Sequence, residues 1–181
     1  MNKKQKHSFG TRHTFLEWII SVGIFTIISV FLLELFLAGN SLQQKAKDQG
    51  KAMVRLENIA EQLKMERDYN AALKQMGALS GWGDVKEEDS CYVIGNISTK
   101  KKENGTPVYV FYYDKDWNQT KETGIYSIVI LPYQKKIAGN TVQAYQGDAY
   151  RLAGYPSVYK KNNSVDLFHL NFAAYTPIEE P

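Results

Sequence analysis

An unbroken apolar run from Phe15 to Ala38 constrains this chain more than any other feature. The run contains no Lys, Arg, Asp, Asn or Pro, and its ionisable residues, Glu17 and Glu34, lie near its two ends. A helix rises about 1.5 Å per residue, so a helix of this length crosses the ~30 Å hydrocarbon core of a bilayer. A soluble core helix would carry a polar stripe, and a cleaved secretory signal would be shorter and end in a small-x-small site, where this chain has Phe36. We therefore predict a transmembrane helix over residues 15–38.

Basic residues flank the run on both sides and bear on its orientation. Those before it, in an acid-free leader over residues 1–14, are Lys3, Lys4, Lys6 and Arg12. Those closely after it are Lys45, Lys47 and Lys51. The bias is small, but a long domain that follows an anchor crosses the membrane largely regardless of charge. We expect a single-pass protein of the cell membrane with a cytoplasmic leader and an extracytoplasmic C-terminal domain.

The rest of the composition excludes several kinds of site. Net charge is only +3, which gives no general case for nucleic-acid binding. Cys91 is the one cysteine, so neither an intrachain disulfide nor a multi-cysteine metal site can form. No Ser-His-Asp arrangement, phosphate-binding glycine loop or zinc-ligand spacing is visible in the sequence. We expect a protein that is not an enzyme and holds no cofactor.

Residues 39–79 have the character of an amphipathic helix. Its apolar residues recur at three- and four-residue spacing and form one stripe, which consists of Leu42, Ala46, Met53, Leu56, Ala60 and Leu63. The opposite face is charged, and no proline interrupts the chain from Thr14 to Met76. The anchor is therefore expected to continue into this helix, which should stop at residues 80–84, where two glycines break the pattern.

Residues 80–181 alternate between apolar and polar side chains, which is typical of strands. The predicted strands are Cys91–Ile97, Val108–Tyr113, Ile125–Leu131 (ended by Pro132), a short Thr141–Tyr145, and a closing hairpin of Tyr150–Tyr159 with Val165–Phe172. In the last strand one face holds Phe168, Leu170 and Phe172, and the other holds Leu167, His169 and Asn171. We predict an α+β fold in which the long helix packs on one face of an antiparallel sheet, while the other face meets water.

The loop after Tyr113 is a weak candidate for a metal site. Asp114, Asp116 and Asn118 place three oxygen ligands like the start of a calcium loop. That loop needs a glycine next and a bidentate Glu at its twelfth position, and these places hold Gln119 and Ile125. A solvated turn between two strands explains the same residues equally well.

Three further features carry charge in positions that bear on function. Lys100, Lys101 and Lys102 are a weak candidate for contact with phosphates or acidic lipid headgroups, although such runs are usually solvated turns. His169 lies on the predicted outer side of its strand, where a histidine is usually a surface residue.

Glu17 sits inside the apolar run, which is unfavourable by a few kcal/mol unless the acid is paired or close to the interface. Glu17 is therefore either a functional residue or one that reaches the headgroups without a role.

The segment His13-Thr14-Phe15-Leu16-Glu17, followed by residues 18–24, resembles the start of type IV pilin-like proteins and pseudopilins. In that family a short basic leader precedes an apolar helix that continues into an amphipathic half, which packs on a C-terminal antiparallel sheet. Residues 165–170 near the C-terminus also look like pseudopilin-like proteins of Gram-positive bacteria. The family's leader peptidase cuts after a glycine, whereas Arg12 stands before the position that corresponds to the first mature residue.

The resemblance implies a non-enzymatic subunit of a type IV filament or a type II secretion-like assembly. Phe15, Ser21 and Gly23 would then pack against the helices of other pilin-like subunits, with Glu17 setting the register. The implied partners are the membrane, those subunits and the secretion or pilus machinery. A membrane-tethered extracytoplasmic binding or sensor domain, in which the helix is only a stalk, is the alternative.

Overall fold

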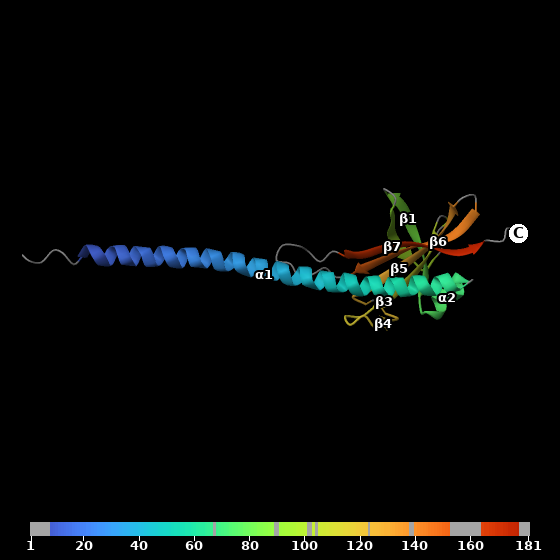
Figure 1. Ribbon diagram of the computed structural model, residues 1–181, viewed down its shortest axis with the longest axis horizontal. Coiled ribbons are helices and arrows are strands. Elements are labelled where there is room, and N and C mark those ends of the chain that lie inside the picture. Colours follow the sequence, from blue (N-terminus) through green and yellow to red (C-terminus); the bar gives the residue numbers. More distant parts are fainter. Residues whose placement is uncertain are drawn as a thin grey trace, which may run out of the picture. The chain divides into compact units, whose positions relative to one another are not determined.

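The computed structural model describes residues 8–66, 68–88, 91–100, 103, 105–122, 124–137, 140–152 and 164–177, and the side chains of residues 8–13, 85–97 and 174–177 lie outside this description. Two helices, α1 (Ser8–Met65) and α2 (Tyr69–Gln75), precede the strands (Figure 1). The strands are β1 Leu79–Glu88, β2 Cys91–Ser98, β3 Thr106–Tyr113, β4 Gln119–Thr120, β5 Tyr126–Ile137, β6 Asn140–Arg151 and β7 Val165–Pro177. The chain divides into two compact units, residues 1–43 and 44–181. The predicted α+β layout, a long N-terminal helix packed on a C-terminal antiparallel sheet, is confirmed.

The apolar run forms the exposed part of α1 in the first unit. An 18-residue window of this helix has a mean hydropathy of 2.5 and none of it is buried, so one helix near the N-terminus is long and apolar enough to span a membrane. Two hydroxyl groups near its middle bond within the helix: Thr26 Oγ1 donates to the Val22 carbonyl and Ser29 Oγ to the Phe25 carbonyl, both at 2.8 Å. These side chains therefore bring no unsatisfied donor into an apolar surrounding.

The helical region after the anchor is not one helix, as the sequence analysis predicted, but two. The α-helix α1 ends at Met65, and Asp68 starts α2 by accepting hydrogen bonds from the backbone N–H groups of Asn70 (3.0 Å) and Ala71 (3.1 Å). Aspartate at an N-cap satisfies donors that a helix start leaves unpaired. The helical region ends at Gln75 rather than at residues 80–84, which belong to β1.

The buried stripe of α1 differs from the predicted one in its first half. Leu56, Ala60 and Leu63 are buried as expected, and Ala52 and Ile59 join them. Leu42, Ala46 and Met53 are exposed. The sheet covers α1 only from Asp48 onward. Contact with the sheet therefore determines which residues of α1 are buried, and the apolar spacing that extends further toward the N-terminus does not.

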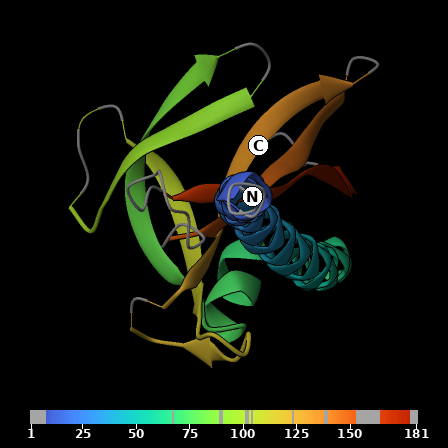
Figure 2. The ribbon, with the colours of Figure 1, turned by 90° about the vertical axis from the view of Figure 1, so that its left-hand side faces the viewer.

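The sheet is antiparallel throughout, with strand order β2-β1-β3-β5-β6-β7, and β4 pairs with β3 (Figure 2). The predicted strands Cys91–Ile97 and Val108–Tyr113 correspond to β2 and β3. Pro132 does not end β5, which continues to Ile137. The last registered pair with β3 is Tyr109 with Ile130, so beyond it β5 pairs only with β6 and a proline is tolerated on the open side.

The closing hairpin is also different from the one predicted. The predicted strand Thr141–Tyr145 is the first half of β6, and β7 pairs with β6 from Val142 to Arg151. Residues 153–163, which include most of the predicted strand Tyr150–Tyr159, lie outside the described residues. A bulge between Ala149 and Tyr150 leaves Leu167 without its own partner, and Leu167 is buried in the core. The strict alternation that assigned Leu167 to the outer face is broken by this extra residue.

Both faces of the sheet centre are buried, so the expectation that one face meets water is wrong there. The helix-side core joins Leu56 and Leu63 of α1 to aromatic and aliphatic residues of the sheet, among them Phe111, Ile128 and Tyr145. A second cluster is formed by Val108, Val110, Val129 and Leu131, which are at most 3% exposed. These residues alternate along β3 and β5 with those of the first cluster, so they lie on the opposite face.

Gly147 of β6 lets α1 approach the sheet closely. A Cβ atom at this position would lie 2.8 Å from Leu56 Cδ1, and Leu56 is completely buried. Gly50, on the exposed side of the same helix, has nothing within 4 Å of an added Cβ. The two glycines therefore have opposite roles: the first is required by packing, and the second only weakens the helix.

We predict that Gly147→Ala lowers the free energy of unfolding by about 1–3 kcal/mol, because Leu56 or the helix must move. Gly50→Ala is the matched control and should raise it by roughly 0.5–1 kcal/mol through helix propensity. Thermal unfolding of the detergent-solubilised chain, followed by circular dichroism, measures both. If Gly147→Ala were as stable as Gly50→Ala, the close contact between α1 and β6 would be wrong.

Candidate functional site

The four residues expected to mediate assembly all lie exposed on α1. Phe15 is 70% exposed, Glu17 and Ser21 are also exposed, and an added Cβ at Gly23 would meet nothing within 4 Å. Glu17 and Ser21 are four residues apart and so lie on one side of the helix. Gly23 and Phe15 point in other directions, so the four residues do not form a single patch.

Exposed apolar side chains surround this part of α1 on every side. Trp18, Ile19, Ile20 and Ile28 are each at least 50% exposed, and at about 100° per residue their side chains are distributed around the whole helix circumference. A water-soluble surface rarely leaves such an area uncovered. The segment therefore requires lipid, other apolar helices or both.

The Asp114 turn is built from hydrogen bonds within the chain. Asp114 Oδ1 accepts from the backbone N–H groups of Asp116 (2.8 Å) and Asn118 (2.9 Å), and Oδ2 accepts from the Asn118 amide at 3.2 Å. The hydrogen bond from the Asn118 backbone holds the pKa of Asp114 below its ordinary value. Within the described ranges no group of three or more His, Cys, Asp or Glu side chains could hold a metal ion. The carboxylate thus shapes the turn, in which Trp117 has a positive φ of 66°.

The lysine candidate is described only in part. Lys100 is exposed, and its backbone N–H donates to Ser98 Oγ at 3.2 Å. Lys101 and Lys102 lie outside the described residues. A joint phosphate-binding surface of these three lysines stays a sequence prediction.

His169 takes part in a link across two strands. Its Nδ1 lies 2.5 Å from Asp148 Oδ1, and Gln146 Nε2 donates to Asp148 Oδ2 at 2.8 Å. Asp148 is 7% exposed and sits directly opposite His169 in the β6–β7 register. The His169 side chain itself is 37% exposed, as expected of a surface residue, but it is anchored by a buried acid. The pairing depends on the register, which the sequence did not supply.

A partly buried ion pair that sequence reasoning missed connects α1 to the end of β6. Arg151 Nη1 donates to Asp48 Oδ2 at 2.9 Å and contacts the Tyr126 hydroxyl at 3.3 Å. The side chains of Arg151 and Asp48 are 16% and 11% exposed. The Tyr126 ring stacks on Trp117 with a centroid distance of 4.3 Å. Asp48 precedes Ala52 and Leu56 at four-residue spacing, and this position within the buried stripe was the available signal.

The ion pair also affects Tyr126. Burial, followed by the hydrogen bond to the Asp48 carboxylate, raises the pKa of Tyr126 to about 12. Since the folded protein holds this hydroxyl neutral more strongly than the unfolded chain does, the resulting stabilisation is fully present below the ordinary pKa of 10. It is lost as pH rises from about 10 to about 12.

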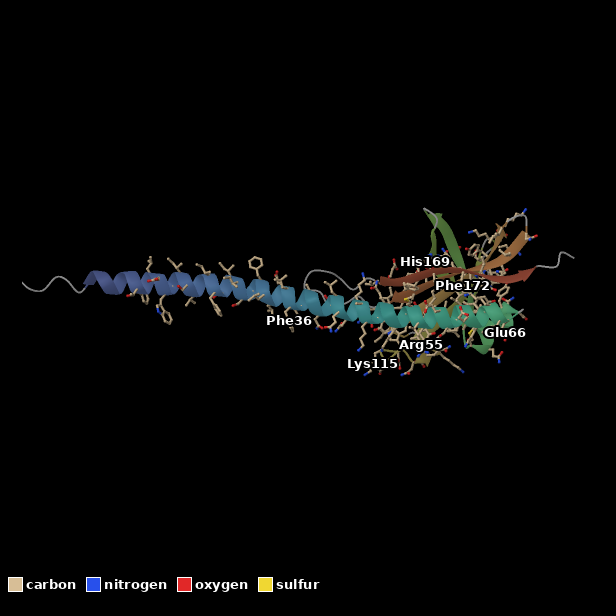
Figure 3. All side chains as sticks on the ribbon, in the orientation of Figure 1. Phe36, Arg55, Glu66, Lys115, His169 and Phe172 are labelled. Carbon is tan, nitrogen blue, oxygen red and sulfur yellow. The ribbon has the colours of Figure 1, made fainter. Side chains whose placement is uncertain are left out.

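A basic groove is formed by α1 and the Asp114 turn. Arg55 of α1 and Lys115 of this turn lie on the same side of the second unit (Figure 3). It is lined by Lys47, Gly50, Lys51, Val54, Arg55, Asp116 and Trp117. Arg55 is already engaged there: its Nη2 donates to the Trp117 carbonyl at 3.1 Å, and its guanidinium lies 6.0 Å from the centre of the Tyr113 ring. The exposed lysines thus supply the positive charge that remains available to a partner.

Comparison of the chain with protein-family models, with curated proteins and with solved structures finds no match. Two surfaces stand out among the described residues, the exposed apolar part of α1 and the basic groove.

We predict that Asp48→Asn lowers the free energy of unfolding by about 2–3 kcal/mol, because it leaves the partly buried Arg151 guanidinium without its counter-charge. Urea titration of the detergent-solubilised chain measures the loss. The same substitution should move the pKa of Tyr126 back toward 10, which a spectroscopic titration against a Tyr126→Phe reference detects.

The control is the double variant Asp48→Leu/Arg151→Met, which replaces the ion pair by apolar groups. Its stability should stay within about 1 kcal/mol of the native chain, since a buried pair is often no better than packed hydrocarbon. A single Asp48→Asn variant as stable as the native chain would show that the ion pair is not formed in solution.

Proposed function

We propose that this chain is a membrane-anchored, non-enzymatic subunit of a pseudopilin-like assembly. The exposed apolar part of α1 carries the proposal, because it is uncovered on all sides and holds the acid Glu17 near its start. The second unit supports it, since its helix packs on an antiparallel sheet in the layout that the sequence resemblance implies. In this reading the anchor lies in the cell membrane with the C-terminal domain on the extracytoplasmic side.

Glu17 would act as the polar contact between neighbouring anchors. A carboxylate among apolar side chains is unfavourable unless a donor or a cation from elsewhere approaches it. A neighbouring subunit can supply such a group when the two helices lie at one relative height, so the acid selects that height. Ser21 would lie on the same contact side, and Phe15 and Gly23 would face other neighbours or lipid.

The alternative function is a membrane-tethered extracytoplasmic binding domain that acts without pilin-like partners. The basic groove favours it, because the groove combines lysines with the apolar surface of Val54 and Trp117. In that case the anchor would serve only as a stalk, and substitutions at Glu17 would have no effect beyond membrane insertion.

Glu17→Ala tests the choice. We expect it to leave membrane insertion intact and to reduce co-purification with pilin-like or secretion components about tenfold, the equivalent of one or two interhelical hydrogen bonds. The measurement is tagged pull-down from detergent-extracted membranes, with the bound partners identified by mass spectrometry.

Glu34→Ala is the matched control, since Glu34 is the second acid of the same apolar run. It should change co-purification less than Glu17→Ala. Equal capture of partners by native chain and Glu17→Ala would refute the assembly role and leave the tethered binding domain.

A further inference from the structure

The basic groove has the size of a site for a small molecule. Its volume is about 470 Å³, and its lining residues come from α1 between Lys47 and Arg55 and from the Asp114 turn. All of them belong to the second unit. Pockets that hold small ligands usually measure ~300–1,000 Å³. The groove is therefore large enough for a ligand of metabolite size.

Positive charge predominates among the residues that line the groove. Lys47, Lys51 and Arg55 follow one another at four-residue spacing and form one row along α1. Asp116 is the one acid among the lining residues, which leaves an excess of two positive charges. The groove therefore attracts an anion, and a doubly charged anion more strongly than a singly charged one.

The acids next to these groups along the chain are engaged elsewhere. Asp48, which follows Lys47, is paired with Arg151 at 2.9 Å. Asp114 Oδ1 accepts hydrogen bonds from the backbone N–H groups of Asp116 and Asn118. Neither carboxylate thus cancels the charge of the groove.

The guanidinium of Arg55 is held in place at the groove. Its Nη2 donates to the Trp117 carbonyl at 3.1 Å, and its central carbon lies 6.0 Å from the centre of the Tyr113 ring. Burial raises the pKa of the Tyr113 phenol, and the Arg55 charge opposes this rise. The bond to the carbonyl uses one of five N–H donors, so the planar fork has further donors for the oxygens of a ligand.

The opposite wall of the groove is fixed before any ligand arrives. Trp117 has a positive φ of 66°, which is uncommon for a bulky residue, and the Asp114 hydrogen bonds close the turn around it. Its indole is 2% exposed and stacks on Tyr126. A wall that is already ordered lowers the entropic cost of binding.

Apolar surface adjoins the row of cations. Val54 is 56% exposed, and an added Cβ at Gly50 would meet nothing within 4 Å. The carbon part of a ligand can rest on Val54 and approach the helix backbone at Gly50. The groove thus suits a molecule with a strongly anionic end and an apolar or flat body.

We propose that the basic groove binds a small, water-soluble phosphate monoester, whose phosphate contacts Lys47, Lys51 and Arg55. A phosphate monoester carries a charge of about −1.5 to −2 at pH 7, which matches the excess of two positive charges. A phosphodiester or a single carboxylate carries only one negative charge. The inference goes beyond the proposed function and does not require it, since Glu17 lies in the first unit and the groove in the second.

The test is isothermal titration calorimetry of the full chain in phosphatidylcholine nanodiscs, with phenyl phosphate as the probe. We expect the native chain to bind this monoester. Methyl phenyl phosphate, a diester with one negative charge, should bind about fivefold more weakly or less, because it loses half of the charge. Equal affinity for the two probes, or no binding of phenyl phosphate at millimolar concentration, would refute the proposal.

Three variants locate the site, and all of their substituted side chains are exposed. Lys47→Gln/Lys51→Gln should weaken binding about tenfold or more, because it removes two charge-assisted contacts. Asp116→Asn should strengthen binding about twofold to fivefold, because it removes the negative charge from the groove. Lys135→Gln/Lys136→Gln makes the same change as the first variant on β5 and should leave the affinity unchanged.

Three further outcomes would contradict the proposal. Native affinity in Lys47→Gln/Lys51→Gln would show that phenyl phosphate binds elsewhere. Succinate bound as tightly as phenyl phosphate would make the ligand a dicarboxylate. Weaker binding of phenyl phosphate in nanodiscs that contain phosphatidic acid would show that a lipid headgroup occupies the groove. Any of these results, with Glu17→Ala still reducing capture of pilin-like partners, would leave the proposed function standing.

Discussion

The close approach of α1 to β6 is the contact on which the C-terminal unit depends. Gly147 gives Leu56 the space to reach the sheet, and Leu56 then joins Leu63 in a core with the aromatic residues of β3, β5 and β6. Arg151 is also a residue of β6, and its ion pair with Asp48 attaches α1 to this strand. With the helix held at these points, Leu56 faces the sheet, and Val54, Glu57 and Glu61 are left exposed.

The two parts of α1 have different surfaces. The first unit presents apolar side chains in every direction, and hydrophobic burial within the chain does not hold it in place. The second unit uses a conventional stripe of small and branched residues against a sheet. The change between them occurs where charged residues such as Lys45 and Lys47 begin, so composition marks the division that the structure shows at residue 43.

The sequence predicted those elements well that depend only on residues near one another along the chain. The apolar run, the strands β2 and β3 and the α+β layout followed from periodicity. The errors arose where a distant part of the chain decided the outcome. Residues 80–84 became a strand because β3 pairs with them, despite two glycines, and Leu167 turned inward because a bulge shifted the register. Asp48 was not singled out from the sequence, because its partner Arg151 is 103 residues away along the chain. The proposed assembly residues were identified from the sequence. The helix geometry showed that Glu17 and Ser21 lie on one side of α1 and that Gly23 lies on another.

The internal hydrogen bonds of Thr26 and Ser29 have a consequence for how anchors would meet. Because both hydroxyls already donate to carbonyls of their own helix, a neighbour gains little by matching its height to them. In the middle of the anchor, these hydroxyl groups then do not fix the axial position of a neighbouring helix. A displacement of that helix along the axis would cost little free energy. In the proposed assembly, the relative height of neighbouring anchors would therefore be set at the ends of the apolar run, by Glu17 and by contacts of the second unit.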